Sequence, residues 1–193
     1  MWPWEHVAVA YLLVSATCWL LRREPPSGAV AATVGVAAVL PDLVDKPLAW
    51  WLHVLPDGRS FAHSLLFAVP AVVAVLTLAR RAGRDDVGIA FAVGYLSHLP
   101  LDVLSSGIGE DSFETRFLLW PVRRGEEGVP DSAVPHLLEL HREFLAYLSS
   151  PAGRLYLAAE LALLTVALAV WLRDGLPGPR WLVARVRPAR RAE

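Results

Sequence analysis

Residues 155–172 read LYLAAELALLTVALAVWL, and Glu160 is the one charged side chain among them. A helix that crosses a bilayer needs about 17–25 predominantly apolar residues. This stretch has that length, and it lacks the alternation of polar and apolar residues that is typical of a half-buried strand. It therefore predicts a membrane-spanning helix.

Four more runs of similar character precede it, at residues 6–21, 29–44, 61–79 and 87–104. Backbone groups in lipid must hydrogen-bond to one another, and a helix satisfies them within one segment. None of the runs carries the polar stripe that a surface helix of a soluble protein shows. We therefore expect an all-α, integral membrane bundle of about five transmembrane helices, rather than a soluble bundle of buried helices.

The composition agrees with this expectation. Hydrophobic residues make up 55% of the 193 residues and charged residues 19%, against about 25% charged in an average soluble domain. The net charge of -1 argues against an electrostatic nucleic-acid binder, so no nucleic acid contact is expected. The single cysteine, Cys18, excludes a disulfide framework and a cysteine-based zinc site.

The basic residues predict how the chain crosses the membrane. Of the 18 Lys and Arg residues, 11 lie directly after the first, third and fifth runs, within residues 22–23, 80–84 and 173–191. Basic residues collect in short cytoplasmic segments. We therefore expect a multi-pass protein of the cell membrane with its N-terminus outside and its C-terminus in the cytoplasm. The expected parts are a membrane-embedded domain at 1–176, with an extracytoplasmic loop region at 105–153, and a basic cytoplasmic tail at 177–193.

With this topology, all six histidines fall on the outer side. His6, His63 and His98 lie at the outer ends of apolar runs. Carboxylates are expected at the same end of the bundle. His98 and Asp102 are spaced i,i+4, and Asp42 and Asp45 are spaced i,i+3, so each pair shares a helix face. Imidazole and carboxylate together favour zinc, manganese or iron(II). The predicted ligands of one or two divalent metal ions, with zinc preferred, are His6, Asp42, Asp45, His63, His98 and Asp102.

Each residue also has a structural interpretation that the sequence leaves open. His6 could be a polar residue at the start of a helix, and Asp45 could pair with Lys46 or Arg59. A predicted helix near residues 136–148 places His136, Glu139 and Glu143 on one face and turns His141 away. That face is either solvated or completes the metal site.

Five short motifs carry a resemblance to a known family: Glu5-His6, LPDLVD at 40–45, RSFAHSL at 59–65, GYLSHLPLD at 94–102 and FLLWP at 117–121. They resemble the YdjM-type family of membrane-bound predicted metal-dependent hydrolases, in the same order and with similar gaps, over residues 1 to about 122. The family's third motif commonly reads His-Arg-Gly-x-Thr-His-Ser; here Gly58 stands at its first His and Ala62 at its Thr.

The order of these residues is also distantly similar to zinc-dependent phospholipase C and S1/P1-type nucleases, which are helical enzymes that cleave phosphoesters. The resemblance implies a hydrolase for a phosphoester substrate, a small molecule or a membrane lipid, at the outer membrane surface. Asp102 and Arg59 are the predicted catalytic residues, because an arginine can hold a phosphate oxygen and stabilise developing charge. Alternatively, Arg59 pairs with Asp45 or Asp57. The rival function is a non-enzymatic membrane protein with a structural or transported divalent metal.

Overall fold

The computed structural model of the protein describes residues 2–107, 113–123 and 132–178. All regular structure in these ranges is helical, which confirms the all-α prediction. Parts of the predicted loop region (108–112 and 124–131) and most of the predicted tail (179–193) lie outside the described residues. The helices are α1 (Pro3–Arg22), α2 (Gly28–Trp50), α3 (Leu65–Arg81), α4 (Asp85–Ser106), α5 (Ala133–Leu148) and α6 (Pro151–Arg173), with a short 3-10 helix, η1 (Arg116–Leu119).

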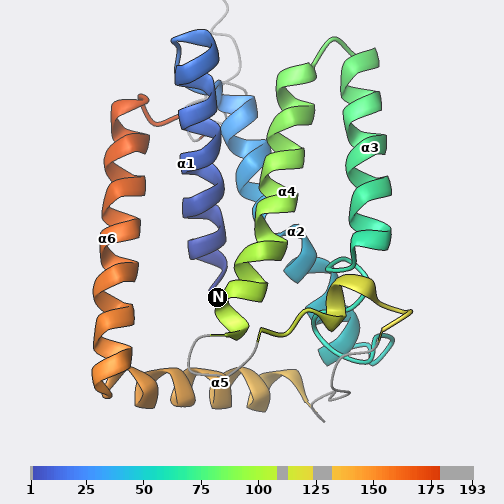
Figure 1. Ribbon diagram of the computed structural model, residues 1–193, viewed down its shortest axis with the longest axis vertical. Helices are drawn as coiled ribbons and strands as arrows, with labels where there is room; N and C mark the ends of the chain where they lie inside the picture. The colour runs from blue at the N-terminus through green and yellow to red at the C-terminus, as the bar shows by residue number, and fades with distance from the viewer. Residues whose placement is uncertain (1, 108–112, 124–131, 179–193) are drawn as a thin grey trace, which may run out of the picture.

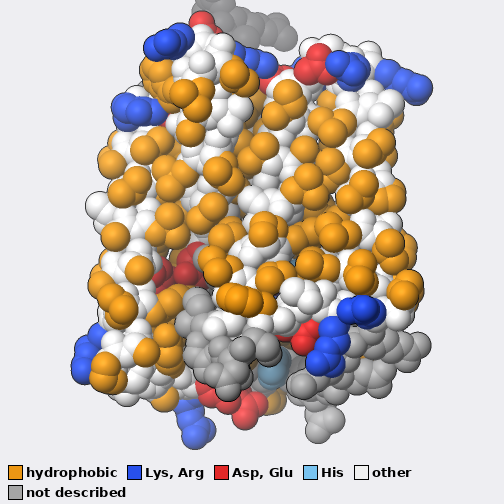
Figure 2. All heavy atoms as spheres, viewed as in Figure 1, with side chains coloured by type: hydrophobic (Ala, Val, Ile, Leu, Met, Phe, Trp, Pro, Cys, Tyr) orange, Lys and Arg blue, Asp and Glu red, His pale blue; other side chains and the backbone are white. Residues whose placement is uncertain are grey.

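Four of these helices, α1, α2, α4 and α6, are long and apolar enough to cross a membrane. The fifth upright helix, α3, has 17 residues and runs beside α4 in Figure 1. Its length of about 25 Å, at 1.5 Å per residue, is close to what a bilayer requires. On the face drawn in Figure 2, apolar side chains form a broad belt over the upright helices, with charged side chains mostly at its two ends. The bundle agrees with about five transmembrane helices.

Serine side chains mark where three of the helices begin. The hydroxyl of Ser27 accepts a hydrogen bond from the Val30 amide, and Ser64 does the same for Leu66. Ser150 accepts from the Gly153 amide at the start of α6. These caps satisfy amides that have no partner inside the helix. The cap at Ser64 fixes the chain directly after His63, one of the predicted metal ligands.

Helices α2 and α4 lie at the centre of the bundle, and Gly94 lets them approach closely. A Cβ atom built on Gly94 would stand 2.8 Å from the Val34 carbonyl oxygen and 2.9 Å from the Ala37 Cβ. Small residues of this kind allow close backbone contact between membrane helices. His98 lies one turn further along α4, and the close approach brings it against Ala38 of α2. The same packing therefore positions a predicted metal ligand.

Asp174 ties the end of α6 to α1. Its carboxylate accepts hydrogen bonds from the Tyr11 hydroxyl, the Ser15 hydroxyl and the Trp19 indole. Burial alone would raise the pKa of Asp174, but these three donors lower it below its ordinary value. The ionised carboxylate is therefore stabilised in the folded protein, and this stabilisation is lost as the pH falls through the lowered pKa.

The remaining α-helix, α5, lies crosswise below the upright helices in Figure 1. Several aromatic contacts join it to the bundle: among them, the ring of His136 meets Trp50, and the rings of His141 and Phe144 meet Trp2, with centroids 5.0, 4.9 and 5.0 Å apart. It begins at Ala133, three residues before the expected start. Its position covers the end of the bundle where the predicted metal ligands gather.

Candidate metal centre

The predicted ligands come from three helices and one turn, all at the end of the bundle that α5 crosses. The first turn of α1, the second half of α2, the turn before α3 and the second half of α4 each contribute. All of these side chains are buried, and the three histidines and Asp45 have no exposed surface. They are His6, Asp42, Asp45, His63, His98 and Asp102.

Hydrogen bonds fix the orientation of two histidine rings. His63 Nδ1 lies 2.8 Å from the Asp45 carboxylate, and His98 Nδ1 lies 2.7 Å from the carbonyl oxygen of Ala38. Both partners are acceptors, so each Nδ1 carries a proton, and each ring turns its Nε2 atom inward, with a lone pair there when the ring is neutral. The two Nε2 atoms are 3.1 Å apart. Two lone pairs at this distance repel each other unless a cation, a proton or a metal ion, lies between them.

Two carboxylates face the same point. Asp42 Oδ1 is 3.5 Å from His63 Nε2 and 3.9 Å from His98 Nε2. Asp102 Oδ2 is 3.4 Å and 3.7 Å from the same two nitrogens. The four ligand atoms all lie within 4.8 Å of one another. Zinc bonds of 2.0–2.2 Å place neighbouring ligands of a tetrahedron about 3.4 Å apart, so this set fits a divalent ion.

His6 lies against this group. Its ring stacks on His98 with centroids 3.9 Å apart, and its Nε2 is 3.2 Å from Asp102 Oδ1 without a hydrogen bond. Within the described ranges, both ring nitrogens of His6 and the Asp42 Oδ1 are buried without a hydrogen-bond partner. Such atoms are costly unless something satisfies them. A bound cation would satisfy Asp42 Oδ1, and it could satisfy one of the two His6 nitrogens, so the residues present fit a metal ion.

Asp45 has a different position from the other carboxylates. Its oxygens accept hydrogen bonds from the backbone amides of Ser60, Ala62 and His63 as well as from the His63 ring. The carboxylate therefore holds the turn before α3 and orients a ligand, and the four converging atoms do not include it. The sequence placed Asp45 among the ligands because it shares a helix face with Asp42.

We predict that replacing Asp45 with asparagine weakens metal binding without abolishing it. The amide cannot accept from all four donors, so the His63 ring loses its fixed tautomer and orientation. Loss of such an outer hydrogen-bond partner typically lowers metal affinity by about 10–100-fold. Titration of the metal-free protein with zinc would measure the change. Unchanged affinity in a folded Asp45→Asn protein would contradict this role for Asp45.

Lys46 pairs with a different carboxylate from the one that the sequence suggested. Its ammonium lies 2.7 Å from Asp42 Oδ2, and its side chain is 30% exposed. The contact holds one carboxylate oxygen and leaves Oδ1 directed at the histidines. The i,i+4 spacing of Asp42 and Lys46 was visible in the sequence, which instead offered Asp45 as the partner of Lys46.

Arg59 lies one aromatic ring away from the centre. Its guanidinium stands over the Phe117 ring, 5.5 Å from the centroid, and the Phe117 ring in turn meets His63 edge-on with centroids 6.1 Å apart. The Arg59 amide donates to the Asp57 carboxylate, whose pKa is raised by burial. The guanidinium therefore belongs to the surroundings of the centre and not to its ligand set.

The histidine and glutamate candidates of α5 stand apart. His136 and His141 contact tryptophan rings, and Glu139 and Glu143 of the same helix are exposed. Among the described residues, the group that could hold an ion is Asp42, His63, His98 and Asp102, with His6 beside it.

A family model supports the membrane assignment. The model for the YdjM inner membrane protein matches residues 1–176. The chain belongs to the YdjM family. The match runs from α1 to the end of α6, well beyond the motifs that end near residue 122, and it includes every residue of the centre. Comparisons with curated proteins and with solved structures gave no match.

Proposed function

We propose that this YdjM family member is a membrane-bound, metal-dependent hydrolase that acts on a phosphoester, including a lipid phosphoester. The observation that carries the proposal is the convergence of four buried ligand atoms, from Asp42, His63, His98 and Asp102, within 4.8 Å. Zinc suits two nitrogens and two oxygens, with manganese or iron(II) as the other candidates. When bound, such an ion supplies Lewis-acid activation of water and of a phosphoryl oxygen.

The chain's own residues divide the remaining tasks. Asp102 turns Oδ2 toward the centre and Oδ1 toward His6, so it would hold the ion and accept a proton from the attacking water. Arg59 would bind a phosphate oxygen of the substrate through its planar guanidinium. Lys46 keeps Asp42 in position from the exposed edge of the site.

The centre would open on the outer membrane surface. The arginines after α1 and α3 lie at the opposite end of the bundle from the centre, where the positive-inside rule places the cytoplasm. The N-terminus would then be outside and the C-terminus inside. A reporter fused after Glu193 should be active only in the cytoplasm, and an extracytoplasmic signal would contradict this orientation.

The function can be tested with detergent-purified protein and a panel of phosphoesters that includes phospholipids. We expect turnover that is lost with a chelator and restored by added zinc. Absence of metal-dependent turnover on every substrate would overturn the enzymatic proposal.

One observation favours a second candidate, a non-enzymatic membrane protein with a structural or transported metal. Four ligand atoms at tetrahedral spacing can close the coordination of zinc, and structural zinc sites are closed whereas catalytic sites keep one position open. Transport is the weaker version, because the bundle beyond the centre has an apolar core formed by residues such as Ala10, Val14 and Val34. Stoichiometric metal without turnover would support the structural role.

A further inference from the structure

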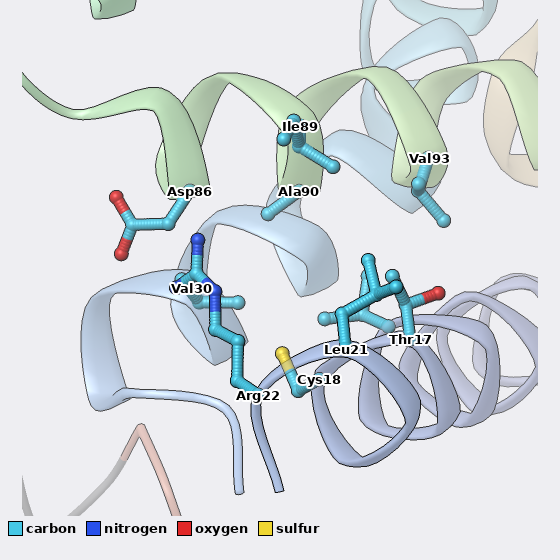
Figure 3. A pocket seen from close by; sticks show the side chains of 10 residues that line it. Thr17, Cys18, Leu21, Arg22, Val30, Asp86, Ile89, Ala90 and Val93 are labelled. Atoms are coloured by element: carbon cyan, nitrogen blue, oxygen red, sulfur yellow. The ribbon is translucent and has the colours of Figure 1, made fainter. Parts of the chain in front are cut away.

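A pocket lies at the end of the bundle opposite the metal centre. It is formed by the last turns of α1, the first turn of α2 and the first turns of α4, as Figure 3 shows. Its space is about 460 Å³, including the part that is open to the surroundings. The apolar side chains around it are Val14, Leu21, Val30, Ile89, Ala90 and Val93.

The location of the pocket selects an apolar occupant. All of its walls belong to membrane-spanning helices, and the exposed side chains of Leu21 and Ile89 lie at its rim. The pocket is therefore continuous with the surface that the bundle presents to lipid tails. The polar side chain of Thr17 does not change this, since its hydroxyl donates to the Leu13 carbonyl within α1. The apolar chemistry of these walls suits a lipid acyl chain.

Two opposite charges stand at the mouth of the pocket. Arg22 is the last residue of α1, and Asp86 lies in the first turn of α4. Figure 3 shows both head groups at the same end of the pocket, beyond its apolar walls. A guanidinium binds phosphate oxygens in a fixed, bidentate geometry, and a carboxylate accepts charge-assisted hydrogen bonds from an ammonium group. The mouth thus offers a partner for each end of a zwitterionic head group.

We propose that this pocket binds one molecule of phosphatidylethanolamine, with an acyl chain between α1 and α4, its phosphate at Arg22 and its ammonium at Asp86. Phosphatidylglycerol offers a phosphate but no ammonium, so Asp86 repels it. Phosphatidylcholine carries a positive charge whose methyl groups cannot donate N–H hydrogen bonds to the carboxylate. The pocket therefore selects the primary amine.

The test is native mass spectrometry of the full chain, released from nanodiscs that contain equal amounts of dioleoyl phosphatidylethanolamine, phosphatidylcholine and phosphatidylglycerol. The wild type should retain one phosphatidylethanolamine about tenfold over either competitor, which is what one charge-assisted hydrogen bond can supply. Asp86→Asn should lose this preference, and Arg22→Gln should lose the bound lipid.

Matched controls exist at the same end of the bundle. Arg80 and Asp85 form an exposed ion pair, 3.7 Å apart, and neither residue lines the pocket. Arg80→Gln and Asp85→Asn remove the same charges and should retain phosphatidylethanolamine as the wild type does. Equal retention of the three lipids by the wild type, or an equal effect of the pocket and control variants, would overturn the proposal.

Cys18 provides a measurement that needs no substitution at the mouth. It lines the pocket and is the one cysteine of the chain. Its alkylation by N-ethylmaleimide should be slower in nanodiscs of phosphatidylethanolamine than in those of phosphatidylcholine. The same alkylation rate in both lipids would count against an acyl chain held beside Cys18.

Discussion

Replacing His98 with alanine is expected to remove the bound divalent metal and, with it, any hydrolytic turnover. The Nε2 atom of His98 is one of the four converging ligand atoms, and it lies 3.1 Å from that of His63. The substitution also leaves the Ala38 carbonyl without its donor. We expect metal affinity to fall by more than about 100-fold, beyond the range of an outer hydrogen-bond partner. Metal analysis of the purified protein would measure it.

A matched control separates this effect from the loss of any histidine at this end of the bundle. His136→Ala removes a histidine of α5 that contacts Trp50 and not the centre, so it should keep its metal. Thermal unfolding gives a second measurement, because a ligand that binds only the folded state stabilises it. Added zinc should raise the Tm of the wild type and of His136→Ala, but not that of His98→Ala. Stoichiometric zinc in a folded His98→Ala protein would contradict the assignment of His98 as a metal ligand.

The sequence predicted the helices of the bundle because each depends on a local property. A long apolar run has one satisfactory backbone conformation in lipid, so its position can be read without knowing its neighbours. The boundaries were less accurate. The second run was expected to end at residue 44, but α2 continues to Trp50 through Pro41 and Pro47. The additional helical residues include Asp45 and Lys46. Because both belong to α2, the helix determines the direction in which each side chain points.

The sequence also placed Asp42 with Asp45 and His98 with Asp102 on shared faces, because helical spacing determines such pairs. It could not distinguish the roles of Asp42 and Asp45. That distinction depends on the turn before α3, where the backbone amides of Ser60 and Ala62 donate hydrogen bonds to the Asp45 carboxylate. Such contacts join segments that are distant in the sequence.

The hydrogen bond from His98 to Ala38 could not be predicted from the sequence either. It depends on how closely α2 and α4 approach, and that distance is set by the absence of a side chain at Gly94. The environment of Arg59 depends on Phe117, which is 58 positions away in the chain. A single sequence shows the chemistry of such residues but not their neighbours.

Arg59 is the residue that separates catalysis from simple metal binding. It lies over Phe117, beside the centre, and gives no atom to the converging group. Arg59→Ala should therefore keep its metal. If Arg59 stabilises the charge that develops on phosphate, turnover should fall by about 100-fold or more, as for the loss of one transition-state donor.

Two further variants sharpen this expectation. Arg59→Lys keeps the charge but loses the planar fork, so it should recover only part of the turnover. Arg116→Ala is the matched control, because Arg116 pairs with the neighbouring Glu114 on an exposed surface, at 3.8 Å, where such pairs contribute about 0–1 kcal/mol. Its turnover should equal that of the wild type. If Arg59→Ala also turned over at the wild-type rate, Arg59 would have no catalytic role; if it lost metal, its role would be to support the turn that carries His63.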